Sequence, residues 1–147
     1  MKRPMASKNT HNSLVGSEVE RSDERIKETQ EVFTPMNLVY KMIGEIPVET
    51  LEDKSKTFLD NSCGCGNFLV GLYKVLTDKY GHSHEEAIDR LYGVDLMLDN
   101  VKETCKNLGV EWGHSHFVNA DGLAYNYSFD GKVDRPDVEK PGTLWDL

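Results

Sequence analysis

The sequence predicts an α/β fold in which crossover helices cover a parallel sheet. Strand-like and helix-like segments alternate along the chain, a glycine-bearing loop follows the first predicted strand, and an acidic residue ends each of the next two strands. Such alternation is typical of units that build parallel sheets. Ligands bind such sheets at the carboxyl ends of the strands, so the sequence also predicts where a site would lie.

The chain divides into two parts that differ in composition. Residues 1–23 are polar and have no sustained apolar period, which predicts a flexible tail, and residues 24–147 are predicted to form one domain. Near the start of this domain, Thr34 can cap a helix and Pro35 suits its first turn. Apolar residues then recur at helical spacing up to Pro47, which we expect to stop this helix.

A connector, a strand and the glycine loop come next. Residues 48–56 are predicted to be a polar connector, and residues 57–60 a short strand that runs into the loop at 61–66. Residues 67–76 have the length and composition of a buried helix.

The second half of the domain repeats this alternation. The predicted elements are a turn at 81–84, a short helix at 85–89, a strand at 91–96, a helix at 99–108 that Gly109 caps, and a strand at 116–121. Residues 122–142 are polar and turn-rich, and residues 143–147 have the composition to start a fourth strand. We therefore expect a sheet truncated after its third strand or within its fourth.

The glycine loop favours a ligand other than a pyrophosphate. Gly64 and Gly66 allow a tight turn and a close approach of backbone to ligand, and the helix behind them presents unpaired N–H groups. Leu69 stands where a dinucleotide-binding loop would carry its third glycine, and no phosphate-binding Gly-Lys-Ser/Thr sequence follows.

Acidic residues end the second and third predicted strands. Asp95 is placed to accept hydrogen bonds from both ribose hydroxyls of a nucleoside, and Asp121 from an adenine amino group. The alternative is that both are polar strand ends or helix caps, which occur in any α/β protein. Their order behind the glycine loop favours the functional interpretation.

Four motifs in a fixed order resemble the adenine-specific DNA methyltransferases of restriction–modification systems. They are Phe33-Thr34-Pro35, the loop Asp60-x-x-Cys63-Gly64-x-Gly66-Asn67-Phe68, Gly93-Val94-Asp95, and Asn119-Ala120-Asp121-Gly122. The resemblance covers about residues 30–147. It implies a Rossmann-like S-adenosylmethionine-dependent methyltransferase fold, S-adenosyl-L-methionine as the cofactor, and the adenine amino group of DNA as the methyl acceptor.

The resemblance also implies which residues bind the cofactor. Phe33, Thr34 and Pro35 would cover its methionine end, and Asp60, Cys63, Gly64, Gly66, Asn67 and Phe68 would surround its amino acid portion. Asp95 would hold the ribose, and Asp121 with Gly122 would face the adenine. The chain departs from the family at Asn61, where proline is usual, and at Cys65, where serine or threonine is common.

The catalytic element of the family, Asn-Pro-Pro-Tyr or Asp-Pro-Pro-Tyr after the fourth strand, has no counterpart in this sequence. We assign no catalytic residue and expect the amino-terminal, cofactor-binding part of a methyltransferase. The missing element would come from a second polypeptide or a longer gene product. The alternative is a non-catalytic S-adenosylmethionine-binding or regulatory module that pairs with another subunit or with itself.

The charge balance bears on the DNA partner. With 17 basic and 25 acidic residues the net charge is −8, which argues against an exposed nucleic-acid-binding face. We therefore expect DNA to be gripped through a missing or separate region. No apolar run approaches the roughly 20 residues of a membrane span, and no secretory signal is present, so we expect a cytoplasmic protein.

Cysteines and histidines raise the question of a metal. Cys63 and Cys65 lack a second cysteine pair at zinc-ligand spacing and are better explained as small buried residues in a tight loop. His114 and His116 would share one side of a strand, but they also lack recognisable partner ligands. We expect no metal, and we expect the histidines at 82, 84, 114 and 116 to be surface turn or strand-start residues.

Two tyrosines, Tyr125 and Tyr127, flank an asparagine in the polar region after the third predicted strand. One interpretation is that they stack on a base. Loop aromatics that pack on the edge of a domain are commoner, and we favour that interpretation.

Overall fold

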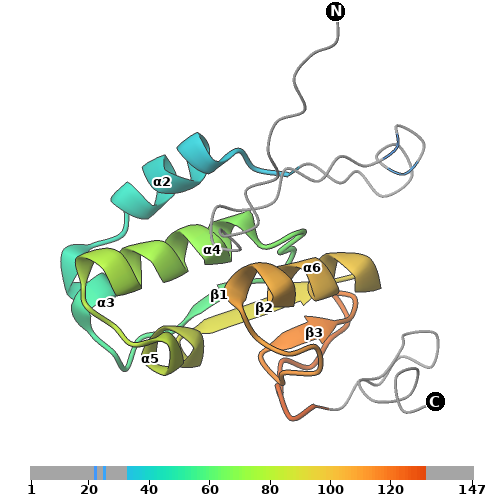
Figure 1. The fold of residues 1–147 in the computed structure, drawn as a ribbon. Coiled ribbons are helices and arrows are strands. Elements are labelled where there is room, and N and C mark those ends of the chain that lie inside the picture. The colour runs from blue at the N-terminus through green and yellow to red at the C-terminus, as the bar shows by residue number, and fades with distance from the viewer. Residues whose placement is uncertain (1–21, 23–24, 26–32, 132–147) are drawn as a thin grey trace, which may run out of the picture.

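Three short parallel strands form the centre of the fold in the computed structural model, which describes residues 22, 25 and 33–131 (Figure 1). The strands β1 (Phe58–Asp60), β2 (Leu91–Asp95) and β3 (Phe117–Asn119) lie in the order β1-β2-β3. Both pairings are parallel. The predicted α/β class with a parallel sheet is confirmed, while the expected fourth strand at 143–147 lies outside the described residues.

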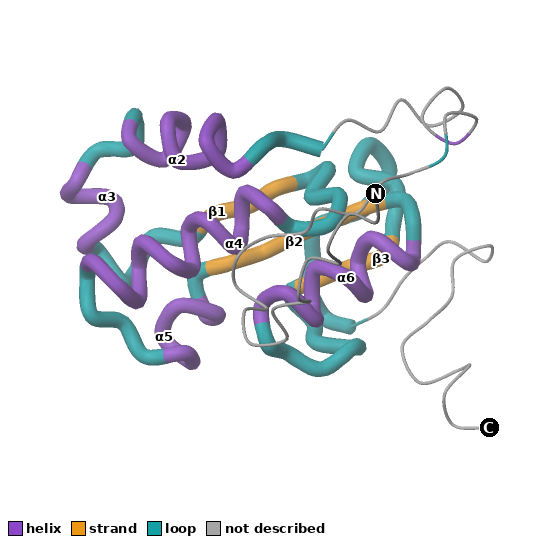
Figure 2. The backbone as a smooth tube through the Cα atoms, turned by 45° about the horizontal axis from the view of Figure 1, so that its top comes forward, coloured by secondary structure: helices purple, strands orange, loops and turns teal. Residues whose placement is uncertain are grey.

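Helices cover one face of this sheet. They are α2 (Met36–Gly44), α3 (Val48–Glu52), α4 (Asn67–Lys74), the π-helix η1 (Val75–Lys79), α5 (His84–Asp89) and α6 (Leu98–Leu108). Figures 1 and 2 show α4 and α6 lying across the same side of the strands, with α2 beside α4. The crossovers from β1 through α4 and from β2 through α6 are therefore those of βαβ units.

The alternation of side chains along the strands separates two apolar clusters. Leu91 and Phe117 point toward the helices and belong to the main core. Val94 and Val118 point to the opposite face and form a second cluster, which Tyr125, Tyr127 and Phe129 cover. In the described part of the chain, the aromatic loop after β3 thus covers this face of β2 and β3.

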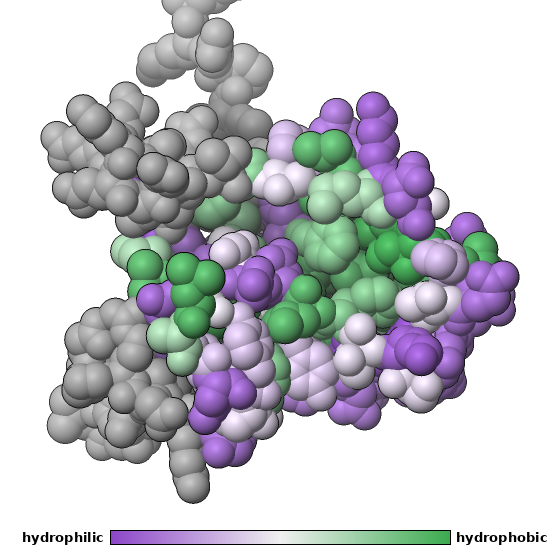
Figure 3. All heavy atoms as spheres, turned by 180° about the vertical axis from the view of Figure 1, so that it is seen from behind, coloured by the Kyte–Doolittle hydropathy of each residue, from purple (hydrophilic) through white to green (hydrophobic). Residues whose placement is uncertain are grey.

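Within residues 33–131, the same face is partly exposed over β1. Leu59 is paired in register with Tyr92, but it is 49% exposed, whereas Tyr92 packs against Phe129. Exposed apolar residues also occur on α2, at Leu38 and Met42. Figure 3 views the molecule from this side and shows apolar side chains gathered on it.

The start and end of α2 differ from the prediction. Pro35, not Thr34, occupies the N-cap position, and no side chain caps the helix. The extended backbone of Pro35 and its fixed φ of −60° suit this boundary. The helix ends at Gly44, with Glu45 as the C-cap, so Pro47 does not stop it.

The predicted polar connector at 48–56 is wrong in its first half, because Pro47 is the N-cap of α3. Leu51 anchors this helix in the core. Arg90, which is 1% exposed, donates to the carbonyl oxygens of Thr50 (2.7 Å), Leu51 (2.6 Å) and Lys56 (2.7 Å). The sequence of residues 48–56 could not predict this helix, because the residue that stabilises it lies about 40 residues away in the chain.

The other helices and strands predicted between residues 57 and 121 are confirmed with small shifts in their ends, while the tail expected at 1–23 lies almost wholly outside the described residues. Gly109 caps α6 in the left-handed conformation, with φ +69°. Ser83 and Glu86 form a reciprocal capping box at the start of α5. The helix expected at 67–76 continues as η1 to Lys79.

Candidate functional site

The glycine loop lies at the carboxyl end of β1 and leads directly into α4. The Cys63 N–H donates to the Val94 carbonyl (3.0 Å), and the Gly66 N–H donates to the Cys63 carbonyl (2.9 Å), which closes a tight turn. Gly66 is the N-cap of α4 with φ +90°, a conformation that residues with side chains rarely adopt. The turn from strand to helix therefore depends on glycine at this position.

Asp95, at the end of β2, holds the loop from the next strand. Its Oδ2 accepts from the Gly64 N–H (2.9 Å), and its Oδ1 accepts from the Met97 N–H (2.9 Å) and from Asn100 Nδ2 (3.1 Å). A carboxylate offers about four acceptor positions, so part of this capacity already serves the protein. Asp95 thus organises the local backbone, whatever it binds in addition.

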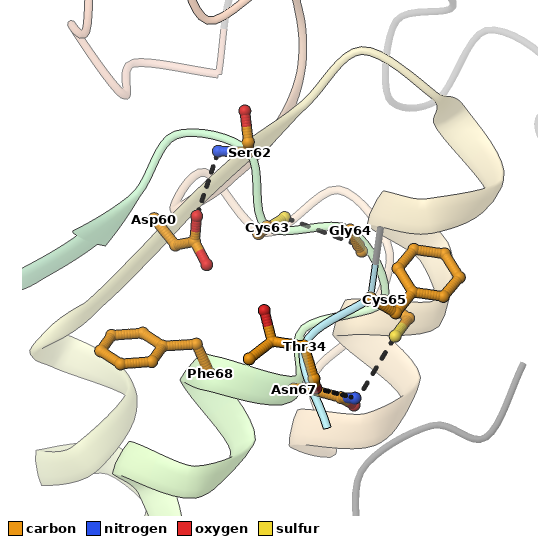
Figure 4. A pocket seen from close by; sticks show the side chains of 9 residues that line it. Thr34, Asp60, Ser62, Cys63, Gly64, Cys65, Asn67 and Phe68 are labelled. Atoms are coloured by element: carbon orange, nitrogen blue, oxygen red, sulfur yellow. Dashed lines mark hydrogen bonds between the residues drawn. The ribbon is translucent and has the colours of Figure 1, made fainter. Parts of the chain in front are cut away.

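Asp60 points into the space in front of the loop, where the Thr34 side chain also points (Figure 4). Its Oδ1 accepts from the Ser62 N–H (3.1 Å). Burial raises the pKa of the Asp60 carboxyl, and the negative charge of Asp95 adds to this effect. Two acids are therefore held close together at one end of the sheet, where they would favour a cationic group.

The segment ahead of α2 forms the opposite wall of this space. Asn67 Nδ2, at the start of α4, donates to the Thr34 carbonyl (3.0 Å). The ring of Phe33 packs so closely on Gly64 that a Cβ atom added there would lie 3.0 Å from it. The segment ahead of α2 thus contacts the loop at Gly64 and the start of α4 at Asn67, and together these parts surround a gap.

This gap is a cavity of about 290 Å³, part of which is open solvent (Figure 4). The residues that line it are Phe33, Thr34, Asp60, Ser62, Cys63, Gly64, Cys65, Asn67 and Phe68. Seven of these are among the residues expected to bind a cofactor. Ser62 and Cys65 were not, although their place within the loop is a signal that points to them.

The other five expected residues do not line the cavity. Pro35 and Gly66 are the N-caps of α2 and α4, and Asp95 holds the loop. Asp121 accepts from the Leu123 N–H (2.9 Å) and so caps a turn after β3. A Cβ atom added at Gly122 would lie 2.6 Å from the Asn61 carbonyl oxygen.

That close approach brings the end of β3 against the loop after β1. Asp95 is paired in register with Asn119, and Asn119 Nδ2 donates to the carbonyl oxygens of Asp95 (3.2 Å) and Leu96 (2.9 Å). The carboxyl ends of the three strands therefore meet at one edge of the sheet. Asp60, Asp95 and the 121–122 turn stand around it.

The loop cysteines are buried, as the interpretation of small residues in a tight loop predicts. Burial raises the pKa of the Cys63 thiol well above its ordinary value. It also raises the pKa of the thiol of Cys105, which lies on α6, to about 12. Both therefore remain protonated thiols, which are poor nucleophiles and poor metal ligands. Within the described part of the chain, no group of three or more metal-ligating side chains comes together.

Two of the histidines and the two loop tyrosines contact neighbouring side chains. His116 stacks on Tyr92, with ring centroids 3.9 Å apart. His82 is 6% exposed and its Nε2 accepts from Arg90 (2.9 Å), so the prediction of a surface residue is wrong there. The preferred interpretation of Tyr125 and Tyr127 as loop aromatics that pack on the domain is confirmed, since both pack against the second apolar cluster, on the face of the sheet opposite the helices.

A comparison with models of protein families gives a match. The model of the family described as N-6 DNA methylase matches residues 20–128, which is most of the chain. No curated protein and no solved structure matches the sequence or the fold significantly. In the part of the chain that is described, no helix is long and apolar enough to cross a membrane.

The match fits the order of motifs along the chain and the meeting of the strand ends at one edge of the sheet. It indicates DNA methylation as the class of activity and DNA as the class of substrate. The chain belongs to the N-6 DNA methylase family.

Proposed function

We propose that the chain binds S-adenosyl-L-methionine at the carboxyl ends of its strands and is the cofactor-binding part of an adenine-specific DNA methyltransferase with a Rossmann-like fold. The observation that carries this proposal is the convergence of the glycine loop, the strand-end acid Asp60 and the segment ahead of α2 around one cavity, with the loop held by the second strand-end acid, Asp95. Membership of the N-6 DNA methylase family supports it.

The cavity suits the methionine end of this cofactor. Asp60 presents a carboxylate for the α-ammonium group, and Gly64 of the loop lines the same cavity. The rings of Phe33 and Phe68 line the same space and would favour a sulfonium through their faces. When bound, the cofactor would supply an electrophilic methyl group for transfer from its sulfur to an adenine amino nitrogen.

The nucleoside would lie beyond the cavity, across the ends of β2 and β3. Asp95 and Asp121 supply acceptors for the ribose and the adenine amino group. Leu96 and Leu123, which follow these acids, are 50% and 97% exposed, and their side chains would flank the purine ring. Covering them would remove exposed apolar surface from water.

Methyl transfer to adenine in DNA would also require a sequence element that holds the acceptor base. No Asn-Pro-Pro or Asp-Pro-Pro sequence occurs in the 147 residues, so we propose that a second polypeptide or a longer gene product supplies it. The same observation favours a second candidate, a non-catalytic or regulatory S-adenosylmethionine-binding module. Transfer of a labelled methyl group from cofactor to DNA, assayed with the chain alone and with added partner, separates the two candidates.

Calorimetry with S-adenosylmethionine tests the shared step. Asp95→Ala should cost about 1.5–3 kcal/mol of binding free energy, because a hydrogen bond to a charged group is lost and the Gly64 N–H loses its acceptor. Asp78→Ala removes an exposed carboxylate from η1, remote from the loop, and serves as the matched control. Unchanged affinity in Asp95→Ala would remove this residue from the site, and no binding by the wild type would refute the proposal.

A further inference from the structure

Thr104, on α6, contacts the glycine loop at three points. Its side chain is fully buried, and its Oγ1 donates to the Gly64 carbonyl oxygen (3.0 Å). The same Oγ1 lies 3.7 Å from Cys63 Sγ. A Cβ atom added at Gly66 would come within 2.9 Å of the hydroxyl and the methyl group of Thr104, so this side chain fills the space beneath that glycine.

Asn107 lies one turn further along the same face of α6. Its Nδ2 donates to the Cys65 carbonyl oxygen (3.1 Å), and its side chain is buried. Two successive carbonyl groups of the loop are therefore held from the helix side. Neither Thr104 nor Asn107 lines the cavity, so neither would touch a ligand there.

The backbone of Gly64 is fixed from both directions by these contacts. Asp95 accepts from its N–H, and Thr104 donates to its carbonyl oxygen. Glycine has the widest backbone freedom of any residue, and Gly64 sits at φ +55°. Without the Thr104 hydroxyl, the loop would sample other conformations and would have to be ordered when ligand binds, which costs affinity.

We propose that Thr104, assisted by Asn107, is a positioning residue that holds the glycine loop in its ligand-binding conformation before the ligand arrives. The inference rests on the proposed binding of S-adenosylmethionine. It goes beyond that proposal because it concerns side chains that hold the loop but do not line the cavity.

The test compares two substitutions at one position. Thr104→Val keeps the shape that fills the space under Gly66 but removes the hydroxyl, whereas Thr104→Ser keeps the hydroxyl and removes the methyl group. By calorimetry on the full chain, Thr104→Val should weaken S-adenosylmethionine binding roughly 3- to 10-fold, and Thr104→Ser should restore affinity to within about twofold of the wild type. Asn107→Ala should weaken binding by a similar factor, which provides a second variant if Thr104→Val does not fold.

Thr77→Val is the matched control, because the Thr77 hydroxyl also donates to a backbone carbonyl, that of Tyr73 (2.9 Å), but in η1 away from the loop. It should leave affinity unchanged. Wild-type affinity in both Thr104→Val and Asn107→Ala would overturn the inference. So would equal weakening by Val and Ser in proportion to a loss of melting temperature. A wild type that does not bind overturns the proposed function and this inference with it.

Discussion

The Asp60 side chain lowers the stability of the folded chain in a position that suits ligand binding. Its carboxyl group is partly buried, faces the cavity and lies near the charge of Asp95. Both effects raise the pKa of Asp60 above its value in the unfolded chain. Ionisation of this group therefore opposes folding, and its contribution to stability is present at low pH and is lost as the pH rises through the folded-state pKa.

Asp60→Asn should for this reason unfold at the same or a higher temperature than the wild type at pH 7, because the amide carries no charge to desolvate. The difference should vanish at a pH below the normal carboxyl range, where Asp60 is protonated in both states. Thermal unfolding followed by circular dichroism across this pH range measures the effect. S-adenosylmethionine binding should weaken in the same variant, and a lower melting temperature at pH 7 would contradict this account.

At the scale of elements, α3 depends on Arg90 more than on its own sequence. The helix has five residues, too few to be stable in isolation. Arg90 donates to two carbonyl groups at its carboxyl end and to His82, and its guanidinium lies 5.2 Å from the centre of the Phe58 ring. The buried Arg90 side chain thus contacts α3, β1 and the turn before α5 at the same time.

Arg90→Met should lower the free energy of unfolding by about 2–4 kcal/mol, since several buried acceptors lose their donor. Urea unfolding measures this loss. Ser83→Ala, which removes only the capping box of α5, is the comparison and should cost about 1 kcal/mol. Equal urea midpoints for the two variants would contradict a larger contribution of Arg90 to stability.

The two faces of the sheet differ at the scale of the whole molecule. Helices α4 and α6 cover one face, while on the other, among the described residues, aromatic side chains of the loop after β3 cover β2 and β3. Leu59 on β1 and Leu38 and Met42 on α2 remain between 46% and 49% exposed. Exposed apolar side chains of this kind mark interaction surfaces.

We accordingly expect the chain to associate with a second subunit or with itself. Sedimentation at increasing concentration should show assembly of the isolated wild type, and the double substitution Leu38→Lys with Leu59→Lys should reduce it by placing charge on both elements. Lys41→Ala, on the same helix, is the control and should not change it. A wild type that remains monomeric at high concentration would contradict self-association.

Much of this protein follows from patterns that lie within a few residues of one another. The parallel βαβ order, the glycine turn after Asp60, the Gly109 cap and the burial of the loop cysteines all depend on local backbone preferences and short-range periodicity. The order of the motifs was sufficient to predict the family, and seven of the twelve expected site residues line one cavity.

What local patterns could not predict depends on partners far apart in the chain. α3 is stabilised by Arg90, the loop is held by Thr104 and Asn107, and Gly122 is required because the Asn61 carbonyl lies beside it. Each of these pairs is separated by about 40 to 60 residues. Backbone preference acts between neighbours in sequence, whereas burial and hydrogen-bond satisfaction act between neighbours in space, and these exist only once the sheet has assembled.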